Sequence, residues 1–317
     1  MFALIYREYG GPEVLTVGSV PEPHAGPGQV RIRVQAASVN VWDVKVRSGR
    51  MKDVVQPAFP VVPGIDASGV VDEIGPGVAG VEVGDEVFGL GSATTAELAL
   101  LDGWAHKPAS MTWAEAAACA LASETAQRAL EDLRVGDGAV LLVEGASGGV
   151  GSAAVQLARA LGATVIGTCS ERNGDYVRSL GAHDTTYGPG IADRVAALGV
   201  GRVTAVLDTA GSGSLPELVE LVDDPRQVVS VADLHAPELG ARAVRNEPRA
   251  IGALETVARL YADGRYRVEV ERLVPLEDAA TAHRLMEAGH VRGKVVIAVA
   301  RQDRRIGARG SAGSSTP

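Results

Sequence analysis

A glycine-rich turn carries the most specific chemical signal in this sequence. Residues 140–172 read VLLVEGASGGVGSAAVQLARALGATVIGTCSER, which predicts a buried strand, the turn, an alanine-rich helix and a second strand. The turn fits the G-x-G-x-x-G pattern as Ala146-x-Gly148-x-x-Gly151. In that pattern the middle glycine admits a pyrophosphate, the last allows close helix packing, and the helix N-terminus attracts phosphate. This context predicts a dinucleotide-binding turn made by Ala146, Ser147, Gly148, Gly149, Val150 and Gly151.

The end of the second strand should distinguish NAD from NADP. A carboxylate there accepts hydrogen bonds from the ribose hydroxyls, whereas small polar residues and arginine accommodate a 2′-phosphate. The segment reads Thr168-Cys169-Ser170-Glu171-Arg172, and its strand-end position has no carboxylate. Because Ser170 and Arg172 can both donate to phosphate, the segment favours NADPH. Glu171 is the discordant residue, unless it faces solvent and pairs with Arg172.

Three zones of the chain would position these residues. Residues 1–121 have short alternating apolar runs followed by turn signals, which predicts a compact antiparallel β domain. Residues 122–265 alternate apolar strands with amphipathic helices, which predicts a doubly wound parallel sheet. Residues 266–300 return to the first pattern, and the polar, Gly/Ser-rich tail 301–317 is expected to be disordered.

Composition limits the class of protein. The 317 residues are 46% hydrophobic and 22% charged, which is ordinary for a globular chain of two domains. The net charge of −9 would repel a phosphate backbone, so nucleic acid is not expected as a partner. Two cysteines exclude a disulfide framework and fit a reducing compartment. With no signal-peptide pattern and no membrane-spanning apolar run, we expect a soluble cytoplasmic protein without a membrane partner.

Several motifs in order resemble the zinc-independent quinone oxidoreductases of the medium-chain dehydrogenase/reductase superfamily. They are YGGPEVL near the start, ASVNVWDVKVRSG at 37–49, FPVVPGIDASGVVDEIGPGV at 59–78, VGDEVFG at 83–89, GASGGVGSAAVQLARALGA at 145–163, LDTAG at 207–211 and HVRGKVV at 290–296. The resemblance implies an α/β protein with a GroES-like β-rich catalytic domain, completed by the C-terminal segment, beside a Rossmann domain. It also implies a homodimer formed through Rossmann edge strands, with the contact near residues 236–249.

Two of these motifs depart from the zinc-dependent members of the superfamily. Those members carry a cysteine ligand in the first motif and a Gly-His-Glu run in the second. In this sequence the position of the cysteine ligand is occupied by Asn40 and its neighbours, and the Gly-His-Glu run is replaced by Gly64-Ile65-Asp66. A tetrahedral zinc would lack its ligands, and the histidines are scattered without metal-ligand spacing. The sequence therefore predicts no metal site.

Without a Lewis acid, alcohol oxidation is difficult, because nothing steadies an alkoxide. Hydride addition to a quinone or an α,β-unsaturated carbonyl needs only hydrogen-bond donors for the resulting anion and a proton. We therefore expect a metal-free, NADPH-dependent reductase of such small molecules. Two alternatives remain: an enoyl reductase acting on a polyketide or enoyl thioester, and a non-catalytic NADPH-binding protein that resembles the lens crystallins.

The resemblance also implies roles for individual residues. Asn40 matches a polar residue beside the nicotinamide and substrate, and Asp43 would fix its loop. Lys45 replaces a frequent tyrosine and would either donate to the anion or be solvated. Thr125 matches a threonine at the start of the helix that joins the domains, and its hydroxyl is expected at the catalytic site near the nicotinamide amide. Its neighbour Glu124 departs from the usual apolar residue. Two further residues are expected at the cofactor, one near the 2′-phosphate and one in the last basic run: Tyr187 and Lys294.

Overall fold

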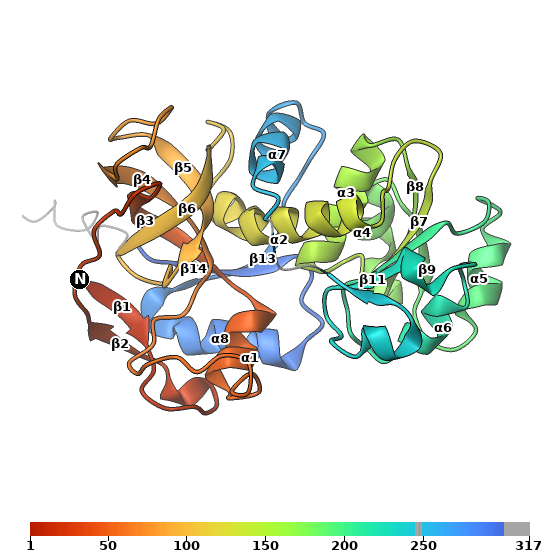
Figure 1. Ribbon diagram of the computed structural model, residues 1–317, viewed down its shortest axis with the longest axis horizontal. Coiled ribbons are helices and arrows are strands. Elements are labelled where there is room, and N and C mark those ends of the chain that lie inside the picture. The colour runs from red at the N-terminus through yellow and green to blue at the C-terminus, as the bar shows by residue number, and fades with distance from the viewer. Residues whose placement is uncertain (245–246, 248, 301–317) are drawn as a thin grey trace, which may run out of the picture.

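The computed structural model describes residues 1–244, 247 and 249–300, so the predicted disorder of residues 301–317 lies outside it. Two six-stranded sheets lie at opposite ends of the long axis, and the helix α2 (Trp113–Asp132) runs between them (Figure 1). The predicted α/β architecture of a GroES-like domain beside a Rossmann domain is confirmed.

The catalytic sheet is mainly antiparallel, and residues from both ends of the chain build it. Its strand order is β13 (Val270–Pro275), β14 (Lys294–Ala298), β3 (Val30–Val39), β4 (Asp66–Ile74), β5 (Glu86–Ser92) and β6 (Leu98–His106). An additional β3–β6 pairing closes the last four strands into a barrel. The first half of β3 alternates buried Val30, Ile32 and Val34 with arginines, as a strand with one buried face requires. A hairpin of β1 (Phe2–Ile5) and β2 (Thr16–Ser19) and the helices α1 (Val41–Arg47) and α8 (Ala279–Ala288) complete this lobe.

The Rossmann sheet is entirely parallel. Its order is β12 (Arg242–Ala243), β11 (Val228–Ser230), β10 (Ala205–Asp208), β7 (Val140–Glu144), β8 (Thr164–Cys169) and β9 (His183–Thr186). The inner strands β7, β8, β10 and β11 are buried on both faces, which explains their largely apolar runs. The order reverses between β7 and β10, and ligands of such sheets bind at the carboxyl ends of the strands beside that reversal.

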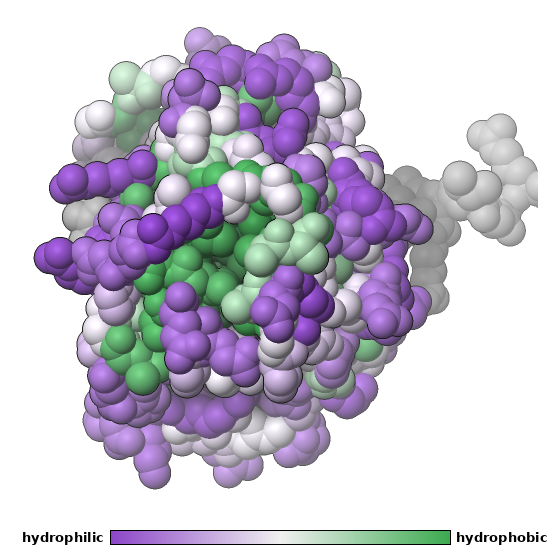
Figure 2. All heavy atoms as spheres, turned by 90° about the vertical axis from the view of Figure 1, so that its right-hand side faces the viewer, coloured by the Kyte–Doolittle hydropathy of each residue, from purple (hydrophilic) through white to green (hydrophobic). Residues whose placement is uncertain are grey.

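The helices of the Rossmann lobe differ in how well they cover the sheet. They are α3 (Gly149–Ala160), α4 (Gly174–Ser179), α5 (Ile191–Ala197), α6 (Leu215–Val219) and α7 (Gly252–Ala262). The short α5 and α6 leave several hydrophobic side chains only partly buried, namely Val140, Leu198, Val200, Val219 and Leu221. Figure 2 looks at this end of the molecule and shows apolar surface at the centre of the face, bordered by hydrophilic side chains.

Helix α2 belongs to both lobes. It packs on β3, β4, β5 and β14 of the catalytic sheet and on α3 and α7 of the other lobe. A single hydrophobic cluster accordingly joins Phe88 of β5, Cys119 of α2 and Leu141 of β7. The domain boundary predicted between residues 121 and 122 falls inside this helix. The two lobes therefore share one connecting helix.

Candidate active site

The glycine turn joins β7 to α3 with the geometry that a dinucleotide needs. A Cβ atom at Gly151 would lie 2.2 Å from the carbonyl oxygen of Gly145, so this glycine is required for the helix to cross the strand. A Cβ atom at Gly148 would meet only that same oxygen, at 3.5 Å. The space beside Gly148 is therefore not filled by other protein atoms. Ala146 is fully buried, whereas Ser147, Gly149 and Val150 are half-buried around the turn.

The segment before the last strand lies directly against this turn. Gly148 and Gly293 form a parallel β-bridge, and the Gly293 amide donates to the carbonyl oxygen of Ser147 at 2.8 Å. A Cβ atom at Gly149 would lie 2.6 Å from Cδ of Lys294, so the aliphatic stem of that lysine packs on the turn. The C-terminal segment of the catalytic domain thus reaches the predicted phosphate site.

The residues predicted at the adenosine end come together in one pocket. A cavity of about 400 Å³ is lined by Cys169, Ser170, Glu171, Arg172, Thr186 and Tyr187. Arg172 donates to the carbonyl oxygen of His290 at 2.9 Å, and Tyr187 is 48% exposed. Glu171 is exposed and lines the same pocket, so the pocket holds both the expected phosphate donors and the discordant carboxylate. With the open glycine turn, these residues fit an adenine dinucleotide.

A buried polar network lies at the catalytic end. Asn40 is 8% exposed at the end of β3, and its Nδ2 donates to Oδ1 of Asp66 at 2.9 Å. The Lys294 ammonium donates to Oδ1 of Asn40 and lies 4.0 Å from Oδ2 of Asp66. Asp66 is fully buried and also accepts from the Ser38 hydroxyl at 2.7 Å and the Leu121 amide at 3.2 Å. Lys294 is expected from the sequence to bind the cofactor, but its charged end belongs to this network and only its stem reaches the turn.

Asp43 holds the loop as expected from the resemblance. Its carboxylate accepts from the backbone amides of Asn40 at 2.9 Å and Gly64 at 3.1 Å. Gly64 has a φ of +106°, and a Cβ atom there would lie 2.4 Å from Oγ1 of Thr94, so a side chain would be excluded. Burial raises the pKa of Asp43 to about 6, although the two backbone donors oppose this increase. The carboxylate therefore joins the two motifs that differ from those of the zinc-dependent enzymes.

Lys45 reaches from one lobe to the other. It lies on α1 of the catalytic domain, is half-buried, and its ammonium approaches the carbonyl oxygen of Ala232 at 3.5 Å. Ala232 follows β11, at the carboxyl edge of the Rossmann sheet. Lys45 is therefore at the boundary between the lobes.

The predicted position of Thr125 at the start of a helix is wrong. Helix α2 begins at Trp113, because Thr112 caps it in a reciprocal pair of bonds with Glu115. Thr125 lies in the middle of that helix, and its hydroxyl donates to Oε2 of Glu124 at 3.4 Å. Glu124 is buried, forms two hydrogen bonds with Arg128 and accepts from the Ala250 amide at 3.0 Å. The departure at Glu124 thus has a structural explanation.

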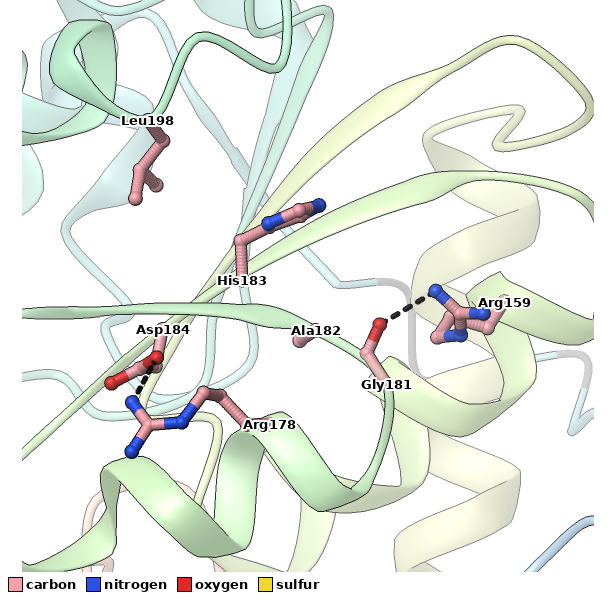
Figure 3. Close-up of a pocket in the computed structure, with 7 residues that line it drawn as sticks. All are labelled: Arg159, Arg178, Gly181, Ala182, His183, Asp184 and Leu198. Atoms are coloured by element: carbon pink, nitrogen blue, oxygen red, sulfur yellow. Dashed lines mark hydrogen bonds and ion pairs between the residues drawn. The ribbon is translucent and has the colours of Figure 1, made fainter.

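A second cavity lies away from this chemistry. It has a volume of about 420 Å³ and is lined by Arg159, Arg178, Gly181, Ala182, His183, Asp184 and Leu198 (Figure 3). Arg178 and Asp184 form an ion pair of 2.6 Å, and Arg159 donates to the carbonyl oxygen of Gly181. Because β9 begins at His183, this cavity is at the amino edge of the strands, opposite to the edge where parallel sheets bind their ligands.

Comparisons with known proteins agree with this geometry. Residues 26–119 match the family model of the alcohol dehydrogenase GroES-like domain, and residues 180–297 match that of zinc-binding dehydrogenases. The quinone oxidoreductase of Sus scrofa is 30% identical over 94% of this chain and 97% of its own length. This chain belongs to the quinone oxidoreductases of the medium-chain dehydrogenase/reductase superfamily. The predicted family is therefore confirmed. Among the described residues of this oxidoreductase, no group of three His, Cys, Asp or Glu side chains could hold a metal ion.

Other relatives of this quinone oxidoreductase family member are covered only in part. A mycocerosic acid synthase-like polyketide synthase of Mycobacterium tuberculosis is 31% identical over 92% of this chain, which spans 15% of that protein. A chloroplast envelope quinone oxidoreductase homolog of Arabidopsis thaliana is 38% identical over 58% of this chain and 60% of its own. The chain thus spans less than two thirds of the length of these relatives. Among solved structures, the quinone oxidoreductase from Coxiella burnetii has a TM-score of 0.82 and 30% identity, covering 95% of this chain and 99% of its own.

No helix in the described part of the chain has the length and hydropathy needed to cross a membrane.

Proposed function

We propose that this protein reduces a quinone or an α,β-unsaturated carbonyl with NADPH and without a metal ion. The observation that carries the proposal is the juxtaposition of an open glycine turn with the buried network of Asn40, Asp66 and Lys294. Relatives with such activities in their names support it, including the 2-methylene-furan-3-one reductase of Solanum lycopersicum and an NADPH-dependent alkenal/one oxidoreductase of Arabidopsis thaliana.

The proposed reaction requires from the protein only a hydrogen-bond donor to the acceptor oxygen and a source of a proton. A bound nicotinamide would supply a hydride to the electrophilic carbon, and a proton would complete the two-electron reduction. Negative charge develops on the acceptor oxygen, so a positioned N–H or ammonium donor lowers the barrier. Asn40 offers a buried amide for this purpose, and Lys45 offers a half-buried ammonium from the neighbouring helix. Screening NADPH oxidation across quinones, enones and enoyl thioesters tests the proposed reaction class.

The donor set at the two diverged motifs supports metal independence. The first motif contributes the Asn40 amide and the second the Asp66 carboxylate, and the ammonium of Lys294 already lies on the oxygen of Asn40. A zinc ion prefers thiolate and imidazole ligands, and an adjacent ammonium would repel it. The chain's own cation therefore compensates the buried carboxylate.

An enoyl thioester is the second candidate substrate. The polyketide synthase of Mycobacterium tuberculosis matches 92% of this chain, and the enoyl reductase CurK has the same fold with a TM-score of 0.83 at 24% identity. Both acceptors would use the same hydride step, because an enoyl thioester is a conjugated carbonyl. The screen of acceptors separates the two candidates, and NADPH binding without reduction of any acceptor would favour the crystallin-like, non-catalytic role.

We expect NADPH to bind at least tenfold more tightly than NADH, a difference of about 1.4 kcal/mol. Ser170 and Arg172 would donate charge-assisted hydrogen bonds to the 2′-phosphate, with Tyr187 beside them. Titration of nicotinamide fluorescence measures both affinities. Arg172→Gln should remove most of the preference, whereas Arg202→Gln, which changes an exposed arginine outside the pocket, should retain it. Equal affinities in the unchanged protein would show that Glu171 sets the selectivity.

We further propose a cytoplasmic homodimer joined along the edge strand β12. Cys119 and Cys169 are both free, as in a reducing compartment, and β12 ends the Rossmann sheet on one side. Part of the expected contact, residues 245–246 and 248, lies outside the described residues. Light scattering at micromolar concentration should give twice the chain mass, and the mass of one chain would contradict the dimer.

A further inference from the structure

The two charged partners of Asn40 determine which way its amide faces. An ammonium can only donate a hydrogen bond, and a carboxylate can only accept one. Lys294 therefore requires the amide oxygen on its side, and Asp66 requires the amide nitrogen on the other. This leaves the second N–H of Asn40 as its remaining donor. We propose that Lys294 is a positioning residue that, with Asp66, fixes Asn40 so that this N–H is presented to the oxygen of a carbonyl acceptor.

Asp66 is a rigid anchor for this arrangement. Its carboxylate is fully buried and accepts from the Ser38 hydroxyl of β3, the Leu121 amide of α2 and the Asn40 amide, which directly follows β3. A buried carboxylate is stable only when hydrogen bonds and a counter-charge compensate it. The ammonium of Lys294 supplies that counter-charge, because it lies 4.0 Å from Oδ2 of Asp66. Lys294 is itself buried, with 6% of its surface exposed. The charge pair therefore holds the amide from both sides.

Lys294 also connects the acceptor group to the cofactor turn. It is the first residue of β14, its amide donates to the carbonyl oxygen of Glu269 at 3.0 Å, and its stem packs on Gly149. The amide of the preceding residue, Gly293, donates a hydrogen bond to the carbonyl oxygen of Ser147. One short segment thus touches the turn that would hold the pyrophosphate and orients the amide that would meet the acceptor. This role rests on the proposed function for its substrate, although the orientation itself can be measured without one.

The side-chain amide protons of Asn40 report the orientation directly. Nuclear magnetic resonance of ¹⁵N-labelled protein gives a pair of signals that Asn40→Ala removes and thereby assigns. Lys294→Met alone leaves the buried Asp66 carboxylate without a counter-charge, so the comparison uses Asp66→Asn with and without Lys294→Met. Because Asp66→Asn leaves the buried ammonium without its charged partner, thermal unfolding first confirms that both variants are folded. In Asp66→Asn the lysine still holds the amide oxygen. In the double variant the amide loses this constraint, and solvent exchange of its protons should become at least tenfold faster. Equal exchange in the two variants would overturn the proposal.

Kinetics give the second measurement. Adding Lys294→Met to Asp66→Asn should lower the rate of hydride transfer about tenfold or more, since small displacements of a positioned group are costly. The dissociation constant of NADPH should change less than twofold. Lys107→Met is the matched control: the side chain of Lys107 is only 5% exposed and pairs with Glu86 at 2.9 Å, but it lies outside the network. It should affect stability without lowering the rate, and an equal fall in rate would contradict the positioning role. If the unchanged protein reduces no acceptor, the proposed function fails while the exchange measurement still decides the orientation.

Discussion

Gly148→Val should weaken NADPH binding at least 100-fold, about 2.7 kcal/mol, while leaving the protein folded. The reason is the difference between two glycines of one turn. A Cβ atom at Gly148 meets only the Gly145 oxygen, at an ordinary 3.5 Å, and φ of −78° with ψ of 177° suits a β-branched residue. The added side chain would instead occupy the space that a pyrophosphate needs for its close approach to the backbone. Fluorescence titration gives the affinity, and thermal unfolding gives the stability.

Two further variants separate binding from folding in this experiment. A Cβ atom added at Gly136 would meet no atom within 4 Å beyond the adjacent residues, so Gly136→Val should change neither NADPH affinity nor stability. Gly151→Val should destabilise the protein, because its Cβ atom would lie 2.2 Å from the Gly145 oxygen. Unchanged NADPH affinity in Gly148→Val would show that the turn does not hold the cofactor phosphates.

Asn40→Ala should lower turnover about 100-fold, the usual loss for one preorganised donor to a developing oxyanion. The variant removes the amide that lies between Asp66 and Lys294, whereas the glycine turn keeps its contacts. NADPH affinity should therefore change little. Steady-state kinetics at saturating NADPH, together with direct titration, measure the two effects separately.

A second buried asparagine provides the matched control. Asn173 is 7% exposed, and its Nδ2 donates to the Ser147 hydroxyl at 3.2 Å, beside the phosphate turn. Asn173→Ala should weaken NADPH binding and leave the rate at saturation nearly unchanged. The opposite pattern, with Asn40→Ala affecting only affinity, would remove Asn40 from the acceptor site.

The fold was predictable because its signals are local. Runs such as VLLVE and TVIGTC are mostly apolar, as is typical of strands buried on both faces, and the turn between them has its glycines at fixed spacing. The start of α2 also has a local signal, which the prediction for Thr125 did not use. Thr112 and Glu115 are three residues apart and form the capping box that places Thr125 mid-helix.

The acceptor site was only partly predictable, because its residues are distant in sequence. Asn40 and Asp66 each stand out as departures from zinc-dependent motifs, but no spacing rule indicates that they share a hydrogen bond. Lys294 is 254 positions away from Asn40 in the sequence. It belongs to the basic segment Arg292-Gly293-Lys294, which in the sequence alone gives no sign that the Lys294 ammonium is buried. Contacts of this kind depend on how β14 pairs with β3, which is a property of the whole sheet.

Single-turnover kinetics with C4-deuterated NADPH test the central claim most directly. The protein, loaded with this cofactor, is mixed with a quinone or an enone, and the position of deuterium in the product is determined. We predict that deuterium is delivered to the electrophilic carbon of the enone and that the rate shows a primary isotope effect. If neither acceptor is reduced although NADPH binds at micromolar affinity, or if saturated alcohols are oxidised at comparable rates, the metal-free reductase account is contradicted.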